Sequence, residues 1–201
     1  MRLLRIPEPF DHPDFLYEAK LDGFRALAHV RGHRCELVSR NGHTFKQWPQ
    51  LAEEIAHAVR AFSCVLDGEI CCLEPDGRSN FKKLLFRRDW PHFYAFDVLS
   101  IEGEDLTSLP LLDRKRRLLH VMPKIETRLL CLDHIAHRGC DLFRVGCERD
   151  LEGIVAKWAR GTYRTDGRAT SCGQPPTPAR ERQRHSRGYG ARGYGATTTG
   201  R

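Results

Sequence analysis

The chain has 201 residues, of which 40% are hydrophobic and 29% charged, and this is long enough to bury the core of one domain with at most a small appendage. The formal charge is +7, but residues 171–201 carry six arginines and one glutamate, so residues 1–170 carry only +2. Net charge is therefore weak evidence for nucleic-acid binding, which would need a local basic patch.

The expected location of the protein and the redox state of its cysteines are inferred from features that the sequence lacks. It has no apolar run near the roughly 20 residues of a membrane span, and residues 1–10 have no continuous apolar core of a secretory signal. The eight cysteines include no C-x-x-C pair and lie mostly among apolar neighbours. We therefore expect a cytoplasmic protein with reduced, mainly buried thiols rather than disulfides or a zinc site.

The first informative stretch is Glu-Ala-Lys-Leu-Asp-Gly-Phe-Arg, from Glu18 to Arg25. Apolar runs precede and follow it, which predicts two strands joined at a tight Asp-Gly turn, with Lys20 at the end of the first strand. A lysine at such a turn can present its amine to a pocket while its stem stays packed. Taken alone, the pattern favours an ordinary surface hairpin, so the role of Lys20 depends on the rest of the chain.

Further strands and a scaffold helix are expected next. Residues 27–38 predict two strands around a turn at Arg31-Gly32, and Asn41-Gly42 supplies another tight turn. An arginine beside that turn, Arg40, can reach a phosphate or ribose, although by default it is an exposed turn residue. Pro49 suits the start of a helix, where its missing N–H costs little. The apolar face of this helix is expected to consist of Leu51, Ile55, Ala58, Val59 and Phe62.

An acidic pair interrupts the next apolar strand, which we expect over residues 63–73. Asp67 and Glu69 flank a glycine there, and burying such carboxylates unpaired is costly. They could pair with an arginine, bind a metal or accept hydrogen bonds from a ligand hydroxyl. A plain pair of acids at a strand end is the remaining interpretation.

The second half of the chain continues the alternation of elements. Residues 80–88 predict a short basic helix, and residues 92–99 a strand whose alternation puts Tyr94 and Phe96 on the face opposite Phe93 and Ala95. The remaining expected elements are a basic amphipathic helix over 113–121, a strand over 125–132, a helix over 137–147 and a strand over 151–157.

Two of these later elements carry specific expectations. In the helix over 137–147, we expect Leu142, Phe143 and Cys147 to face inward. The last strand has an acid, Glu152, at its start and a lysine, Lys157, at its far end. An isolated pattern of this kind would mean little without the segments that precede it.

Five motifs now follow one another on successive expected strands: Lys-x-Asp-Gly-x-Arg, Ser-Arg-Asn-Gly, Asp-Gly-Glu, Tyr-Ala-Phe-Asp and Glu-Gly-Ile-Val-Ala-Lys. In this order they resemble the motif series of the covalent nucleotidyltransferases, and among these the ATP-dependent DNA ligases, most nearly the bacterial end-joining type. The resemblance covers roughly residues 7–168. It implies an α+β, ATP-grasp-like fold of two mostly antiparallel sheets with flanking helices and the nucleotide between them.

The resemblance also implies roles for residues. Lys20 would attack the α-phosphate of ATP, release pyrophosphate and hold AMP, which would pass to a DNA 5′-phosphate before a 3′-hydroxyl seals the nick. The implied ATP contacts are Glu18 at the adenine edge, Arg25 and Arg40 at ribose or phosphate, Glu69 at the ribose hydroxyl, Phe96 and Val155 on the two adenine faces, and Lys157. Glu69 and Glu152 would hold Mg²⁺ or Mn²⁺. The expected partners are nicked or broken duplex DNA and end-joining proteins, and we expect a monomer.

The chain departs from the family near Thr170. Family members continue with a strand that bears a Lys-x-Lys pair and then an oligonucleotide-binding domain, whereas no lysine follows Lys157 here. We therefore expect an incomplete adenylation domain over residues 1–169, a disordered tail rich in Arg, Gly, Pro and Thr over residues 170–201, and no oligonucleotide-binding domain. A frameshift or truncation would explain this departure. It predicts an unpaired sheet edge and impaired catalysis.

Other interpretations stay open on the sequence. An RNA ligase or a capping guanylyltransferase shares the lysine motif. A different class is a non-catalytic nucleic-acid-binding remnant that acts through the Arg/Gly-rich tail. A non-functional gene fragment is the third.

Overall fold

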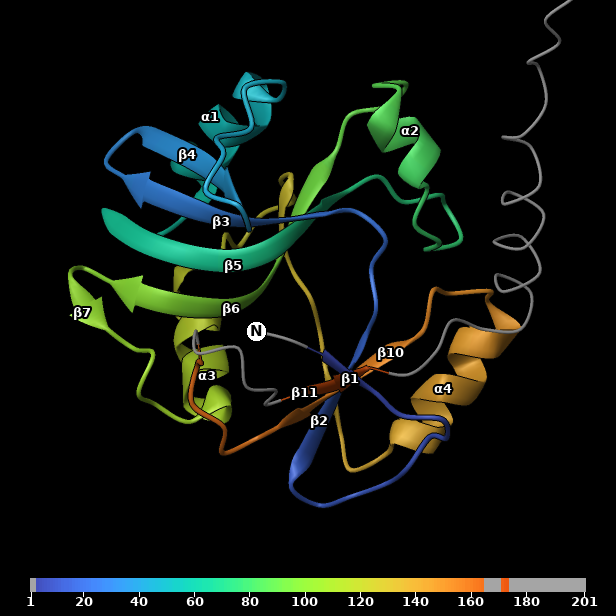
Figure 1. Ribbon diagram of the computed structural model, residues 1–201. Coiled ribbons are helices and arrows are strands. Elements are labelled where there is room, and N and C mark those ends of the chain that lie inside the picture. The colour runs from blue at the N-terminus through green and yellow to red at the C-terminus, as the bar shows by residue number, and fades with distance from the viewer. Residues whose placement is uncertain (1–2, 165–170, 174–201) are drawn as a thin grey trace, which may run out of the picture.

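The computed structural model describes residues 3–164 and 171–173, which form two β-sheets with four helices packed around them (Figure 1). The larger sheet has the strand order β4-β3-β5-β6-β7, and β8 pairs with β6 outside this path. All of its pairs are antiparallel except β6 with β8. Its strands are β3 (Phe24–Arg31), β4 (Arg34–Ser39), β5 (Ser63–Cys71), β6 (His92–Ile101), β7 (Glu104–Asp105) and β8 (Leu129–Cys131).

The smaller sheet joins segments that are far apart in the sequence, in the order β1-β11-β10-β2-β9. Its strands are β1 (Leu3–Arg5), β2 (Phe15–Ala19), β9 (Ile135–Ala136), β10 (Ile154–Trp158) and β11 (Ser171–Gly173). Strand β11 is antiparallel to β10 and parallel to β1. The prediction of an unpaired edge beside β10 is therefore wrong, as is the prediction of disorder for residues 171–173. The rest of the expected tail, residues 170 and 174–201, lies outside the described residues.

Four helices cover the sheets: α1 (Pro49–Ala58), α2 (Phe81–Leu85), α3 (Leu111–Val121) and α4 (Gly139–Glu148). Figure 1 shows α1 and α2 beside the larger sheet and α4 beside the smaller one. Helix α1 begins at Pro49 as predicted and buries Leu51 and Ile55. Phe62 lies beyond its end and is 68% exposed, so its predicted place on the apolar face is wrong. The predicted α4 face holds for Leu142 and Phe143 but not for Cys147, which is exposed.

Two apolar clusters hold these layers together. The large one lies between the larger sheet and helices α1 and α3, and it includes Phe93 and Ala95 of β6. The predicted alternation along β6 is confirmed, because Phe96 lies on the other face and is only partly buried. The small cluster centres on Tyr17 and Ile154, where α4 packs against β2 and β10. The strand predicted over residues 125–132 is present but shorter, as β8.

The described cysteines are all free, as expected for reduced thiols. Cys64, Cys71 and Cys72 are buried, whereas Cys140 and Cys147 are exposed, so the thiols are less uniformly buried than predicted. Within the described part of the chain, no helix has the length and apolar character to cross a membrane.

Candidate active site

A cavity of about 540 Å³ is walled by residues of both sheets. Strands β2 and β10 of the smaller sheet contribute one wall, and β3, β5 and β6 of the larger sheet contribute another. All of the residues predicted to bind ATP line it: Glu18, Lys20, Arg25, Arg40, Glu69, Phe96, Val155 and Lys157. Five segments that are scattered in the sequence therefore converge on one pocket large enough for a nucleotide.

Lys20 is positioned by the pairing of β2 with β10. Its backbone N–H donates to the carbonyl of Gly153 at 2.9 Å, directly beyond the last registered pair of the two strands. Its side-chain Nζ lies 2.5 Å from Oε1 of Glu152, which is buried. The predicted nucleophile and one predicted metal ligand are therefore in direct contact.

The Asp-Gly turn after Lys20 is held closely against β5. A Cβ atom added at Gly23 would clash with the carbonyl oxygen of Ile70 and lie 2.9 Å from Cβ of Cys71. The backbone N–H of Asp22 donates to Oγ of Ser79 at 3.2 Å. Only glycine can lie this close to the backbone of β5. The close contact fixes the position of the turn and therefore the position of Lys20 in the cavity.

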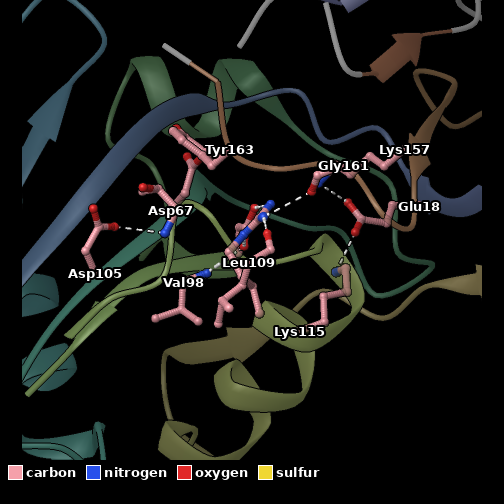
Figure 2. Close-up of polar contacts among 12 residues, drawn as sticks. Glu18, Asp67, Val98, Asp105, Leu109, Lys115, Lys157, Gly161 and Tyr163 are labelled. Carbon is pink, nitrogen blue, oxygen red and sulfur yellow. Dashed lines mark hydrogen bonds and ion pairs between the residues drawn. The ribbon is translucent and has the colours of Figure 1, made fainter.

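Arg25 is paired with Asp67, one of the roles considered for this buried acid. Its Nε donates to Oδ1 at 3.0 Å and its second terminal nitrogen to Oδ2 at 2.5 Å. The hydroxyl of Tyr163 donates to the same Oδ2 atom at 2.9 Å, and Figure 2 shows Tyr163 beside Asp67. Burial alone would lower the pKa of Arg25, but its bonds to Asp67 raise it. Arg25 is therefore a fixed cation in the cavity wall.

Glu69 lies opposite Arg25 in the ladder between β3 and β5. Burial raises the pKa of Glu69 to about 7, although the charges of Arg25 and Lys20 act in the opposite direction. The neighbouring Gly68 carries no side chain because a Cβ atom there would lie 2.6 Å from the ring of Phe93. The glycine thus lets β5 and β6 approach while Glu69 points into the cavity.

A metal site is incomplete on the protein side. Among residues 3–164 and 171–173, no group of three or more His, Cys, Asp or Glu side chains is placed to hold an ion. Mg²⁺ is commonly bound through one or two carboxylates together with substrate phosphates. The charges of Glu69 and Glu152 influence one another, and both carboxylates lie near Lys20. Two carboxylates together with the phosphates of ATP would therefore fit the way in which Mg²⁺ is commonly bound.

Glu18 lies in a buried triad with two lysines (Figure 2). Its Oε1 atom is 2.5 Å from Nζ of Lys115, and its Oε2 atom is 2.6 Å from Nζ of Lys157. Burial raises the pKa of Glu18, but the two lysines more than offset this and the net change is a lowering. A nucleotide would therefore meet Glu18 as part of a group with one net positive charge.

Lys115 is a site residue that sequence analysis missed. It comes from α3, which was expected to be only a basic amphipathic helix. A signal was present, because Leu111, Lys115 and Leu118 recur at the spacing of one helix face and all three are buried. A lysine within an inward-facing apolar stripe requires a buried anion, and Glu18 supplies it.

Two cationic side chains lie over the ring of Phe96, an aromatic residue of the cavity wall. Nζ of Lys157 lies 4.2 Å from the ring centroid of Phe96, and the guanidinium carbon of Arg25 lies 5.4 Å from it. Val155 pairs with Glu18 in the register of β10 and β2, so it lies on the opposite sheet from Phe96. Such an arrangement can hold a flat ring between an aromatic and an aliphatic side chain.

A second buried ion pair supports the site from behind. Arg114 of α3 donates to both carboxylate oxygens of Asp97 at 2.8 Å and to the carbonyls of Leu109 and Gly161. Asp97 is the last residue of the Tyr-Ala-Phe-Asp motif, directly after Phe96. The pair therefore joins β6, which carries Phe96, to α3, which carries Lys115, and to the segment that directly follows β10, the strand of Lys157.

Comparison with known proteins places the chain among ligases. The model of the family described as "ATP dependent DNA ligase domain" matches residues 5–171. The "Multifunctional non-homologous end joining protein LigD" of Pseudomonas aeruginosa is 31% identical over 159 residues, which cover 76% of this chain and 19% of that protein. The "SPbeta prophage-derived DNA ligase-like protein LigB" of Bacillus subtilis is 27% identical over 177 residues, which cover 84% of this chain and 63% of that protein.

A solved structure has a similar fold. The crystal structure of the ligase domain from M. tuberculosis LigD superimposes with a TM-score of 0.71 at 24% identity, covering 86% of this chain and 58% of that one. The chain thus spans less than two thirds of each of these relatives. Because the family model spans most of the chain and the five motifs converge on one cavity, the chain belongs to the ATP-dependent DNA ligase domain family.

Proposed function

We propose that this chain is the adenylation module of a DNA ligase and that Lys20 is its nucleophile. One observation carries the proposal: every residue predicted to bind ATP lines the cavity into which Lys20 projects. Nζ of Lys20 attacks the α-phosphorus of ATP, a nitrogen–phosphorus bond forms, and the bond to pyrophosphate breaks while the amine loses its proton.

The phosphates and the base occupy opposite parts of the cavity in this proposal. Arg25 and Arg40 contact ribose or phosphate, Phe96 and Val155 enclose the adenine, and Glu69 accepts a hydrogen bond from the ribose. Glu69 and Glu152 would hold Mg²⁺ or Mn²⁺, which when bound neutralises charge on the phosphates. Glu18 reads the adenine edge from within its pairs with Lys115 and Lys157.

The later steps concern DNA. AMP passes from Lys20 to a 5′-phosphate of nicked or broken duplex DNA, and a 3′-hydroxyl then displaces it to seal the strand. The relative from Pseudomonas aeruginosa, which is named as an end-joining protein, supports a DNA break as the substrate. We propose that the chain acts as a monomer beside end-joining proteins.

We also propose that the first step is slow in this chain. Of the cations that line the cavity, Lys20, Arg25 and Lys157 are each in an ion pair with a carboxylate. Within the described residues, Arg40 is the cavity cation for which no such pair is found. Residues 158–201 contain no lysine, and a shortage of preorganised cations commonly costs orders of magnitude in rate.

Labelling with α-³²P-ATP and Mg²⁺ tests the proposal directly. A labelled protein band is expected for the unmodified chain and for the control Lys46→Ala, which changes an exposed lysine outside the cavity. No band is expected for Lys20→Ala. Equal labelling of Lys20→Ala would disprove the nucleophile assignment, and rapid stoichiometric labelling followed by efficient nick sealing would disprove the slow first step.

Two substrate comparisons separate the related enzyme classes. Stronger labelling by α-³²P-GTP than by α-³²P-ATP would point to a guanylyltransferase. Sealing of an RNA nick in preference to a DNA nick would point to an RNA ligase.

A further inference from the structure

An exposed surface that combines aromatic and basic side chains lies on α2 and the segment directly after it, and the proposed ATP chemistry leaves it unused. We call Lys82, Phe86, Arg87, Arg88 and Trp90 the basic–aromatic surface. Phe86 is 60% exposed and Trp90 is 53% exposed, and Leu85, the last residue of α2, is 51% exposed. Burying one such side chain typically stabilises a fold by about 1.5–3 kcal/mol, so their exposure within six residues is unusual.

The cations of this surface are available to a partner. No ion pair is found for Lys82, Arg87 or Arg88 within the described residues, whereas Lys83 is paired with Glu74 and Asp89. All three unpaired cations are exposed. The acid in the same stretch, Asp89, is therefore balanced by Lys83, and the surface keeps a net positive charge.

Arginines already lie over the exposed rings. The guanidinium carbon of Arg88 is 5.5 Å from the ring centroid of Phe86, and that of Arg128 is 5.6 Å from the ring of Trp90. Arg128 also donates to the carbonyl of Trp90 at 3.3 Å, which fixes the backbone there. Each ring thus has a cation on it, the combination that binds nucleobases by stacking and phosphates by charge.

The surface is anchored to the wall of the cavity. Phe81, the first residue of α2, lies 5.1 Å ring to ring from Phe24, which lines the cavity. Ser79, just before α2, accepts the hydrogen bond from Asp22 in the Lys20 turn. A strand bound to the basic–aromatic surface would therefore be tethered to the element that carries the nucleophile.

We propose that the basic–aromatic surface binds single-stranded DNA, such as an overhang or frayed strand next to a break. Phe86 and Trp90 stack on bases, and Lys82, Arg87 and Arg88 contact phosphates. Exposed rings favour a single strand because a duplex hides its base faces in the stack, leaving only phosphates and groove edges. The choice of DNA as the nucleic acid rests on the proposed function.

Emission from Trp90 tests the contact locally. In a Trp158→Phe chain, Trp90 is the exposed tryptophan of the described residues, since Trp48 is buried. Saturating oligo(dT), with ATP omitted, is expected to quench this emission. Unchanged emission at saturation would overturn the proposal, because DNA held elsewhere on the chain leaves Trp90 untouched.

Affinity measurements separate stacking from charge. Fluorescence anisotropy with a labelled single strand is expected to show about ten-fold weaker binding for Phe86→Ala and for Trp90→Ala. The matched controls Leu119→Ala and Arg116→Ala, which alter exposed residues of α3, should stay within two-fold. Arg88→Ala should weaken binding and lower its salt dependence.

Binding of duplex DNA by the same variants shows whether the surface binds single strands or the backbone of a duplex. Binding of a duplex of equal length should change much less in Phe86→Ala and Trp90→Ala than binding of the single strand does. An equal loss for both would show a duplex-backbone surface and overturn the single-strand proposal, as would wild-type affinity in both variants. Self-labelling with ATP in the absence of DNA reports the proposed function separately, so either proposal can fail without the other.

Discussion

Nζ of Lys20 lies 2.5 Å from Oε1 of Glu152, so the residue proposed to attack ATP is held by a buried carboxylate just before the neighbouring strand β10. The pair arises because β2 and β10 run antiparallel, which places the end of one beside the start of the other. Glu152 thus positions the amine in the free protein, and the amine must leave this ion pair to bond with phosphorus.

Glu152→Gln is expected to slow self-labelling by about 10²–10³-fold, because it removes both the charge that positions Lys20 and a proposed metal ligand. The rate of α-³²P-ATP labelling in single turnover measures this. Glu148→Gln changes an exposed acid of α4 outside the cavity and serves as the control. A wild-type rate in Glu152→Gln would show that the pair has no part in the chemistry.

Lys115→Met is expected to lower the free energy of unfolding by roughly 3 kcal/mol, because removing one partner of a buried ion pair leaves the other poorly compensated. Urea denaturation measures the change. Arg116→Met, one residue along the same helix, removes an exposed pair with Asp113 and should cost about 0.5 kcal/mol or less.

A double variant tests whether the loss comes from Glu18. If Lys115 acts through Glu18, Lys115→Met combined with Glu18→Gln should lose less stability than the two single variants together. Additive losses would mean that Lys115 stabilises the fold through its packing instead.

Acid should destabilise the protein in part through Glu18. Although burial opposes it, the pairing with Lys157 and Lys115 lowers the pKa of Glu18 in the folded state below its ordinary 4.5. The unfolded chain then binds the proton more readily, so this contribution to stability is present above pH 4.5 and is lost as the pH falls below it. Unfolding free energies between pH 3 and 6 should fall less steeply in Glu18→Gln, and parallel curves would contradict this.

Gly68→Ala is expected to destabilise the fold by about 1–3 kcal/mol, because the added methyl would lie 2.6 Å from the ring of Phe93 and from the carbonyl of Tyr94. It should also weaken ATP binding by displacing Asp67 and Glu69. Gly146→Ala is the matched control, since it lies in α4 with its nearest contacts at 3.9 Å and should stabilise the helix by up to about 1 kcal/mol. Thermal unfolding with and without ATP distinguishes the two.

Thiol labelling should follow burial. Iodoacetamide at pH 8 is expected to modify Cys140 and Cys147 in the native protein and to spare Cys64, Cys71 and Cys72 until it unfolds. Burial raises the pKa of Cys64 to about 12 and that of Cys72 to about 11, which keeps both as unreactive thiols. Peptide mass mapping identifies the modified positions, and rapid native labelling of Cys64 would contradict the arrangement of β5.

Much of the fold was predictable because local patterns are strong here. The alternation along residues 92–99, the helix start at Pro49 and the turn at Gly32 each appear in the structure as expected. The prediction for Phe62 was wrong because α1 ends at Ala58. The prediction for Cys147 was wrong because this residue, although inside α4, lies on an exposed part of the helix. A periodic pattern indicates which face is apolar but not where the helix stops.

The order of the five motifs, through the family that it resembles, indicated the residues that line the cavity proposed to bind ATP, Lys20 among them. The strands and turns that carry these motifs were predictable because such signals are local. The partners of these residues depend on tertiary packing. Lys115 reaches Glu18 from a helix almost a hundred residues away, Glu152 meets Lys20 through strand pairing, and β11 covers the edge of β10. Such contacts depend on how two sheets and a helix meet in space, and each buried charge then takes the nearest opposite charge that the packing supplies.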